Sequence, residues 1–223
     1  MSRPGLVAGI AVLAMLLAAP AASAQARRHS WEIAPGAIWF SGMDLGSSAA
    51  TLERPGGGEF ELFKTESKLE RGFGPALSLS FFPASRLAVE VAFSYSRPGA
   101  STRVSADAED AAPVTSEIGL QQYLIEGNAR WYLARARGAW RPFVRAGGGY
   151  LRQLDDSSAH VETGSTIQAG LGVDRAFRER PAGRLRRAGL RVDARALART
   201  GGFDVEDTLR LGFSAGALLF LGF

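Results

Sequence analysis

The chain ends with the stretch Thr208-Leu-Arg-Leu-Gly-Phe-Ser-Ala-Gly-Ala-Leu-Leu-Phe-Leu-Gly-Phe223. Every odd-numbered residue from Leu209 to Phe223 is apolar, whereas the even positions begin with threonine, arginine, glycine and serine. A period of two with one apolar face is typical of a β-strand whose two faces meet different surroundings. The stretch therefore predicts a strand that finishes on a terminal aromatic residue.

The start of the chain carries the pattern of a secretory signal peptide. Arg3 is followed by the uncharged apolar run 6–19 and then by the small residues Ala22-Ser-Ala24. Positive charge, apolar run and small-residue cleavage site occur in this order in signal peptides. As an uncleaved anchor, the run would be too short to cross about 30 Å of hydrocarbon as a helix. We therefore expect 1–24 to be a cleaved signal peptide and 25–223 to form one domain.

Seven more segments alternate in the same way as the end of the chain. In the segment 87–96, Val89, Val91 and Phe93 lie on one face of the expected strand, and Glu90 lies on the other. Such alternating runs, bounded by glycine, proline and polar residues, are typical of strands. Together with 209–223, we expect strands at 30–40, 73–81, 87–96, 118–133, 140–154, 165–176 and 188–198.

The polar faces of these strands carry four acidic and five basic side chains, which nearly balance. They are Glu90, Glu126, Asp174 and Asp193, and Arg130, Arg145, Arg191, Arg195 and Arg210. An arginine that faces hydrocarbon at mid-depth costs about 2–4 kcal/mol, whereas inside a narrow barrel it can pair with a carboxylate. A water-soluble, ligand-carrying barrel would have the opposite arrangement, with an apolar interior. We therefore expect the charges to form a structural network inside and the apolar faces to meet lipid.

These patterns predict an all-β fold, an eight-stranded antiparallel up-and-down transmembrane β-barrel. Eight strands leave an interior that side chains just fill. Because paired arginines and carboxylates would occupy that interior, we expect a plugged lumen. A narrow path for ions or small solutes is the alternative.

Four strings in the second half of the chain carry a resemblance to a known family. They are RPFVRAGGGY at 141–150, AGLGVD at 169–174, LRVDAR at 190–195 and ALLFLGF at 217–223. The sequence resembles the small eight-stranded outer-membrane β-barrels related to the membrane domain of OmpA. The resemblance implies a bacterial outer-membrane location among lipids that include lipopolysaccharide, and a structural or adhesive role. It also implies that the barrel assembly machinery recognises the terminal aromatic, Phe223.

The connections between the expected strands alternate in length. Long polar loops are expected at 41–72 and 97–117, and short turns at 83–86 and 134–139. The remaining connections are 155–164, 177–187 and 199–207. Outer-membrane barrels have long loops outside the cell and short turns in the periplasm. With an even number of strands, both termini are expected in the periplasm, and a surface ligand is expected to contact the two long loops.

The composition excludes several kinds of chemistry. There is no cysteine, so disulfides and thiolate metal sites are excluded. The mature chain carries a formal charge of only +3, because Arg3 leaves with the signal peptide and the whole chain carries +4. Its basic residues are scattered, so we expect no nucleic-acid partner.

Two histidines limit the catalytic alternatives. His29 and His160 are far apart in the sequence, so they predict no metal site. A lipid-modifying enzyme, such as a lipid A deacylase, would need His160 with the nearby Ser157, Ser158 and Glu162. The deacylase pattern of a histidine and a serine two residues apart on one strand is absent. We therefore expect no catalytic residue and no cofactor.

Overall fold

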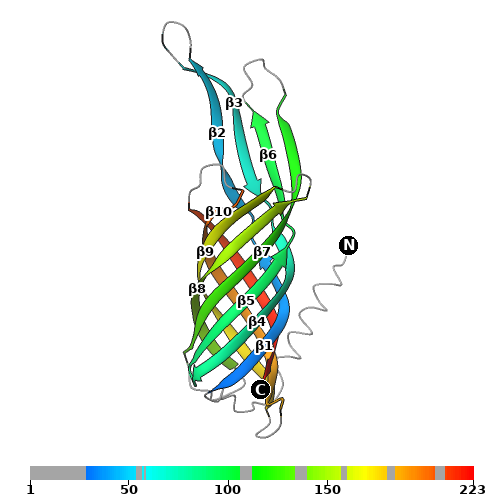
Figure 1. Cartoon of the computed structure of the whole chain (residues 1–223), viewed down its shortest axis with the longest axis vertical. Coiled ribbons are helices and arrows are strands. Elements are labelled where there is room, and N and C mark those ends of the chain that lie inside the picture. The colour runs from blue at the N-terminus through cyan, green and yellow to red at the C-terminus, as the bar shows by residue number, and fades with distance from the viewer. Residues whose placement is uncertain are drawn as a thin grey trace, which may run out of the picture.

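A closed ring of eight antiparallel strands forms the body of the computed structural model (Figure 1). The structure describes residues 29–53, 57, 59–105, 112–133, 140–156, 160–179, 184–203 and 209–223. The ring strands are β1 (Ser30–Phe40), β4 (Gly72–Ala84), β5 (Leu87–Ser96), β7 (Val114–Tyr132), β8 (Trp140–Asp155), β9 (Val161–Glu179), β10 (Arg187–Gly201) and β11 (Arg210–Gly222). The ring closes where β1 pairs with β11, with Ile38 opposite Gly216. The prediction of an all-β, eight-stranded antiparallel barrel is confirmed.

The ring strands separate a polar interior from an apolar exterior. On β9, Thr166 and Gln168 are buried in the lumen, whereas Ile167 and Leu171 are 70% and 68% exposed on the outer wall. Alternation along a strand sends neighbouring side chains to opposite faces. Large apolar side chains are exposed all round the ring, which is the surface that a lipid-facing barrel presents.

Three further strands extend the barrel at one end, shown at the top of Figure 1. They are β2 (Met43–Glu53), β3 (Glu59–Leu69) and β6 (Gly99–Ser105). β3 lies between β2 and β6, and β6 pairs with the first residues of β7, where Val104 is opposite Val114. With residues 114–119 of β7, these strands form a four-stranded sheet, which we call the extension. We call the opposite end of the barrel, where β4 turns into β5, the short-turn end.

The prediction of long loops at 41–72 and 97–117 is wrong, because most of these residues form strands. Their sequence hides the strands, because polar or small residues occupy both faces, as in the run 47–51 of β2. The strands are stabilised by partners distant in sequence. For example, the hydroxyl oxygens of Ser67 and Thr102 lie 3.0 Å apart across β3 and β6.

The boundaries of β9 also differ from expectation. β9 begins at Val161 and ends at Glu179, so it takes residues from the predicted connections 155–164 and 177–187. The predicted signal peptide, 1–24, and the predicted turn 134–139 lie outside the described residues. Among the residues that the structure describes, no helix is long and apolar enough to cross a membrane.

Candidate functional site

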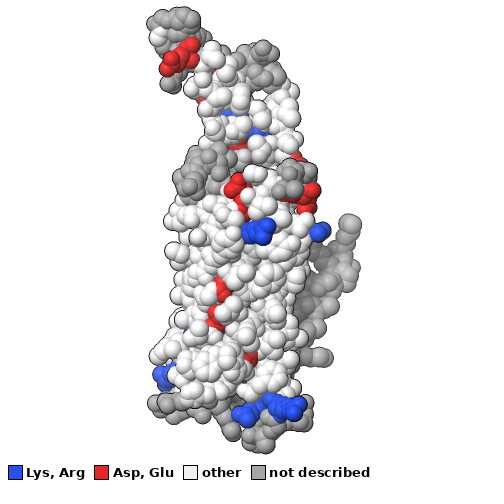
Figure 2. Space-filling view, in the orientation of Figure 1, with Lys and Arg blue, Asp and Glu red and all other residues white. Residues whose placement is uncertain are grey.

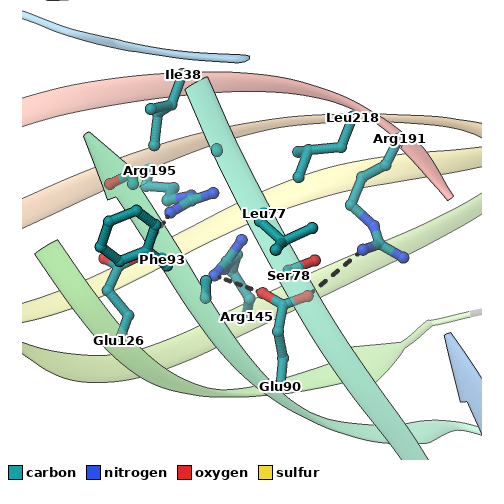
Figure 3. Close-up of a pocket in the computed structure, with 13 residues that line it drawn as sticks. Ile38, Leu77, Ser78, Glu90, Phe93, Glu126, Arg145, Arg191, Arg195 and Leu218 are labelled. Atoms are coloured by element: carbon teal, nitrogen blue, oxygen red, sulfur yellow. Dashed lines mark hydrogen bonds and ion pairs between the residues drawn. The ribbon is translucent and has the colours of Figure 1, made fainter. Parts of the chain in front are cut away.

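Arg191 on β10 lies at the centre of a buried ion network inside the barrel. Its Nε donates to Asp174 Oδ1 at 2.8 Å, and its Nη2 contacts Glu32 of β1. Its Nη1 lies 3.4 Å from Glu90 Oε2, the contact that Figure 3 marks between these two side chains. Three carboxylates from three different strands therefore meet one guanidinium. We call this cluster, with the arginines described next, the lumen network.

Arg130 on β7 joins the same carboxylates from the other side of the lumen. Its Nη2 lies 3.2 Å from Glu32 Oε1, and its Nε lies 3.3 Å from Glu90 Oε2. Nη2 also donates to Ser80 Oγ at 2.7 Å. The Tyr132 hydroxyl donates to Asp174 Oδ2 at 2.8 Å. Neutral hydroxyls thus add hydrogen bonds to the charged groups, which helps to offset the cost of burying them.

Two more arginines extend the network toward the extension. Arg145 Nη2 lies 2.9 Å from Glu90 Oε1. Arg195 Nη1 lies 3.1 Å from Glu126 Oε2, and its Nε lies 2.5 Å from Asp193 Oδ1. Figure 3 shows Glu90 and Glu126 pointing into a small pocket beside these arginines. The pocket belongs to the lumen network and is almost filled by it.

The lumen carries more positive than negative charge. Among the described residues, the carboxylates buried there are Glu32, Glu90, Glu126, Asp174 and Asp193, and the buried arginines are Arg130, Arg141, Arg145, Arg187, Arg191, Arg195 and Arg199. Arg141 and Arg187 lie at the short-turn end. The Arg141 guanidinium stacks 3.9 Å from the centre of the Tyr132 ring and donates to the Ser85 carbonyl oxygen at 3.1 Å. Aromatic faces thus stabilise part of the excess positive charge.

Apolar and amide layers lie above the lumen network, toward the extension. Buried Ile38, Phe40, Leu124, Leu151 and Leu197 form one apolar cluster across the lumen. Closer to the extension, the amide group of Gln153 donates to Gln122 at 2.9 Å, and its oxygen accepts a hydrogen bond from Arg199 at 3.3 Å. Leu45, Leu69, Ala100 and Leu120 form a second apolar cluster where the extension meets the ring.

The structure places eight of the nine predicted network residues together in the buried lumen. The ninth, Arg210, lies half-buried near the extension and donates to the Leu45 carbonyl oxygen at 3.1 Å. Sequence analysis missed Glu32, Arg141, Arg187 and Arg199. Glu32 could have been found, since it alternates with outward-facing Trp31 and Ile33, but Arg187 fell in a predicted turn.

Phe223, the predicted assembly signal, follows β11 at the short-turn end. Its backbone N–H donates to the Trp31 carbonyl oxygen at 2.8 Å, and 47% of its surface is exposed. It thus continues the pairing of β11 with β1 to the last residue.

The two faces of the extension differ in polarity. Lys64 and Glu66, which lie on β3 and point away from the barrel axis, are exposed and 3.0 Å apart. The hydrogen bond from Lys64 lowers the pKa of the Glu66 carboxyl. The face that continues the lumen wall instead carries Phe63, Val104 and Val114, which are 40%, 36% and 65% exposed. The sheet therefore presents exposed apolar side chains on one face and the Lys64–Glu66 ion pair on the other.

The histidines do not gather catalytic partners among the described residues. His160 Nε2 lies 2.7 Å from Glu162 Oε1, and its ring contacts Phe203 at a centroid distance of 5.6 Å. Ser157 and Ser158 lie outside the described residues. His29 precedes β1 at the short-turn end, the opposite end of the barrel from His160. Within the described ranges, no three or more acidic or histidine side chains group so that they could hold a metal ion.

Comparison with solved structures identifies the architecture. The outer membrane protein OprG from Pseudomonas aeruginosa superposes with a TM-score of 0.59 at 11% identity, covering 89% of this chain and 98% of OprG. The chain has the fold of a small outer-membrane β-barrel. Neisserial surface protein A (NspA) is also similar, with a TM-score of 0.49 at 13% identity, covering 86% and 95% of the two chains. No protein-family model and no curated protein matches the sequence.

Proposed function

We propose that this protein is an outer-membrane barrel that presents the extension as a binding surface for proteins outside the cell. The proposal rests on the presence of the extension. A ring of eight strands is closed without it, because Phe40 already pairs with Gly72 below the β2–β3 hairpin. The apolar side chains Phe63, Val104 and Val114 give the extension a surface suited to contact with another protein.

The proposed orientation follows from the topology. β1 begins and β11 ends at the short-turn end, so both ends of the barrel domain lie on the side where outer-membrane barrels have their short turns. The extension then projects from the cell surface. We further propose that lipopolysaccharide and phospholipids surround the wall, and that the assembly machinery recognises Phe223.

Single cysteines test this orientation, because the natural sequence has none. Ser47→Cys on β2 and Ser85→Cys in the turn between β4 and β5 serve as a matched pair. A membrane-impermeant maleimide added to intact cells is expected to label Ser47→Cys and to leave Ser85→Cys unlabelled until the outer membrane is permeabilised. The reverse pattern would refute the proposed orientation.

Removal of the β2–β3 hairpin, 43–69, tests the role of the extension. We expect the shortened protein to stay a folded barrel, since the pairing of β1 with β4 ends at Phe40 and Gly72. It should therefore still migrate faster unboiled than boiled on a gel. Adhesion of the producing cells to a surface coated with serum proteins is expected to fall to that of cells without the protein. Unchanged adhesion would contradict the proposed role.

We also propose that the lumen conducts no ions. The lumen network and the two apolar clusters fill successive levels of the interior, and an apolar constriction opposes hydrated ions. Purified protein in a planar bilayer is expected to give no stepwise current at neutral pH. Reproducible current steps from the folded protein would favour the alternative of a narrow channel.

A non-catalytic role completes the proposal. His160 is paired with Glu162 and packed against Phe203, which leaves it in an exposed loop setting rather than in a buried catalytic cluster. Lipid A from cells that overproduce the protein should keep its mass. A mass change that disappears in His160→Ala would instead establish the lipid-modifying enzyme.

A further inference from the structure

Two outward-facing arginines mark the edges of the apolar wall. Arg152 on β8 lies near the extension, and Arg175 on β9 lies opposite Trp140 at the short-turn end. Between their levels, no outward position described in the ring strands carries a charged side chain. On β8, for example, the outward residues between them are Pro142, Val144, Ala146, Gly148 and Tyr150.

The spacing of these arginines matches the thickness of a membrane. From Trp140, the partner of Arg175, to Arg152 is twelve residues of β8 (152 minus 140). At about 3.3 Å per residue and a tilt of about 40°, this corresponds to roughly 30 Å along the barrel axis. The hydrocarbon core of a bilayer is also about 30 Å thick. Arg152 therefore lies at the level of lipid headgroups when the wall spans the membrane.

A second arginine lies beside Arg152 at this level. Tyr123 on β7 pairs with Arg152 on one side and with Tyr95 of β5 on the other. The rings of Tyr95 and Tyr123 lie 5.0 Å apart. Arg97 Nε donates to the Tyr95 hydroxyl at 2.5 Å, and its guanidinium lies 5.8 Å from the centre of that ring. Two exposed guanidiniums thus flank a pair of tyrosine rings in tilted contact, and Figure 2 shows basic atoms where the white wall meets the extension.

The wall below this cluster is suited to acyl chains. Phe93, Ile125 and Tyr150, on the same three strands, are 43%, 51% and 53% exposed. A ligand that fits both the arginine–tyrosine cluster and the apolar wall has anionic groups at the cluster and several hydrocarbon chains along the wall. Arginine binds phosphate bidentately through paired N–H donors, so two guanidiniums at this level suit the phosphate groups of a lipid headgroup.

We propose that Arg97, Arg152 and the Tyr95–Tyr123 pair bind a phosphorylated lipid A headgroup, with its acyl chains on the wall at Phe93, Ile125 and Tyr150. The inference rests on the proposed orientation, which places this end of the wall in the outer leaflet, where lipopolysaccharide lies. Arg175 at the other end offers no equivalent site. Arg175 is only 2% exposed, and its guanidinium lies 4.9 Å from the centre of the Trp140 ring.

Binding of lipid A to the purified full chain in detergent tests the proposal. The comparison is between the wild type and the double variant Arg97→Gln/Arg152→Gln, with native mass spectrometry reporting bound lipid. Arg103→Gln is the matched control, because Arg103 is exposed on the extension and above the wall. Gel mobility without boiling verifies that each variant is folded.

We expect the double variant to bind bisphosphorylated lipid A about tenfold more weakly, equivalent to about 1.4 kcal/mol, and the control to bind like the wild type. Dephosphorylated lipid A should bind the wild type and the double variant equally weakly. Equal binding of bisphosphorylated lipid A by both proteins would overturn the proposal. So would equally tight binding of phosphatidylglycerol by the wild type, because the cluster would then recognise any anionic lipid.

The labelling experiment separates this proposal from the proposed function. If maleimide labels Ser47→Cys on intact cells but the double variant retains lipid A, only the lipid A site is refuted. If Ser47→Cys is inaccessible from outside, both proposals are refuted.

Discussion

Asp174→Asn is expected to lower the free energy of unfolding by about 3–5 kcal/mol, the usual cost of removing one partner from a buried ion pair. Asp174 is fully buried and accepts hydrogen bonds from Arg191 Nε at 2.8 Å and from the Tyr132 hydroxyl at 2.8 Å. Arg130 and Arg187 also lie within 4.0 Å of it. Because the lumen already has more arginines than carboxylates, the loss of a negative charge leaves these guanidiniums less compensated.

Urea unfolding of the barrel in lipid vesicles, followed by tryptophan fluorescence, measures this loss. Arg141→Gln is the control, since it removes one of the excess positive charges from the same lumen. We expect a smaller effect, about 1 kcal/mol, from the lost contact with the Tyr132 ring. Equal losses in the two variants would mean that charge balance does not govern the stability of the network.

Ile167→Arg is expected to destabilise the barrel by about 2–4 kcal/mol, because an arginine at mid-depth must be buried in hydrocarbon. Ile167 is 70% exposed and lies opposite Gly148 of β8, between the levels of Arg152 and Arg175. Its exposure means that the substitution creates no cavity inside the lumen. The loss of stability therefore shows whether hydrocarbon or water surrounds the wall, and does not reflect a packing defect.

Val161→Arg on the same strand is the matched control. Val161 is 39% exposed and lies beyond Arg152 toward the extension, so its cost should be about 0–1 kcal/mol. The difference between the two losses of stability, measured in the same vesicles, reports how much deeper in the hydrocarbon Ile167 lies than Val161. If both cost the same, the wall does not cross hydrocarbon at Ile167.

The ring was predictable because each of its strands has one face toward the polar lumen and one face on the apolar outer wall. On β5, Val89, Val91 and Phe93 face outward and Glu90 faces the lumen, as the alternation indicates. The same rule extends to Glu32, which lies between the outward residues Trp31 and Ile33 on β1. Pairing inside the network was not predictable, because it depends on which side chains of distant strands reach the same level of the lumen.

The extension was not predictable from local pattern. Its strands meet water on both sides over much of their length, so they need no apolar period of two. What defines them is register with another segment, such as Thr65 opposite Val104 and Val104 opposite Val114. Arg97 and Arg152 were not recognised either, because only the pairing of Tyr95, Tyr123 and Arg152 across three strands brings the two arginines to one level.

The seam between β1 and β11 has a consequence for how the molecule matures. Glu32 and Arg191 are separated by 159 residues, and β10 neighbours β1 only through β11, so this contact cannot form before the first and last strands meet. Contacts this distant are slow to form, because the intervening chain must first be brought together. Until the barrel closes between β1 and β11, the guanidinium of Arg191 and the carboxylate of Glu32 stay hydrated. Their buried ion pair therefore forms only at closure.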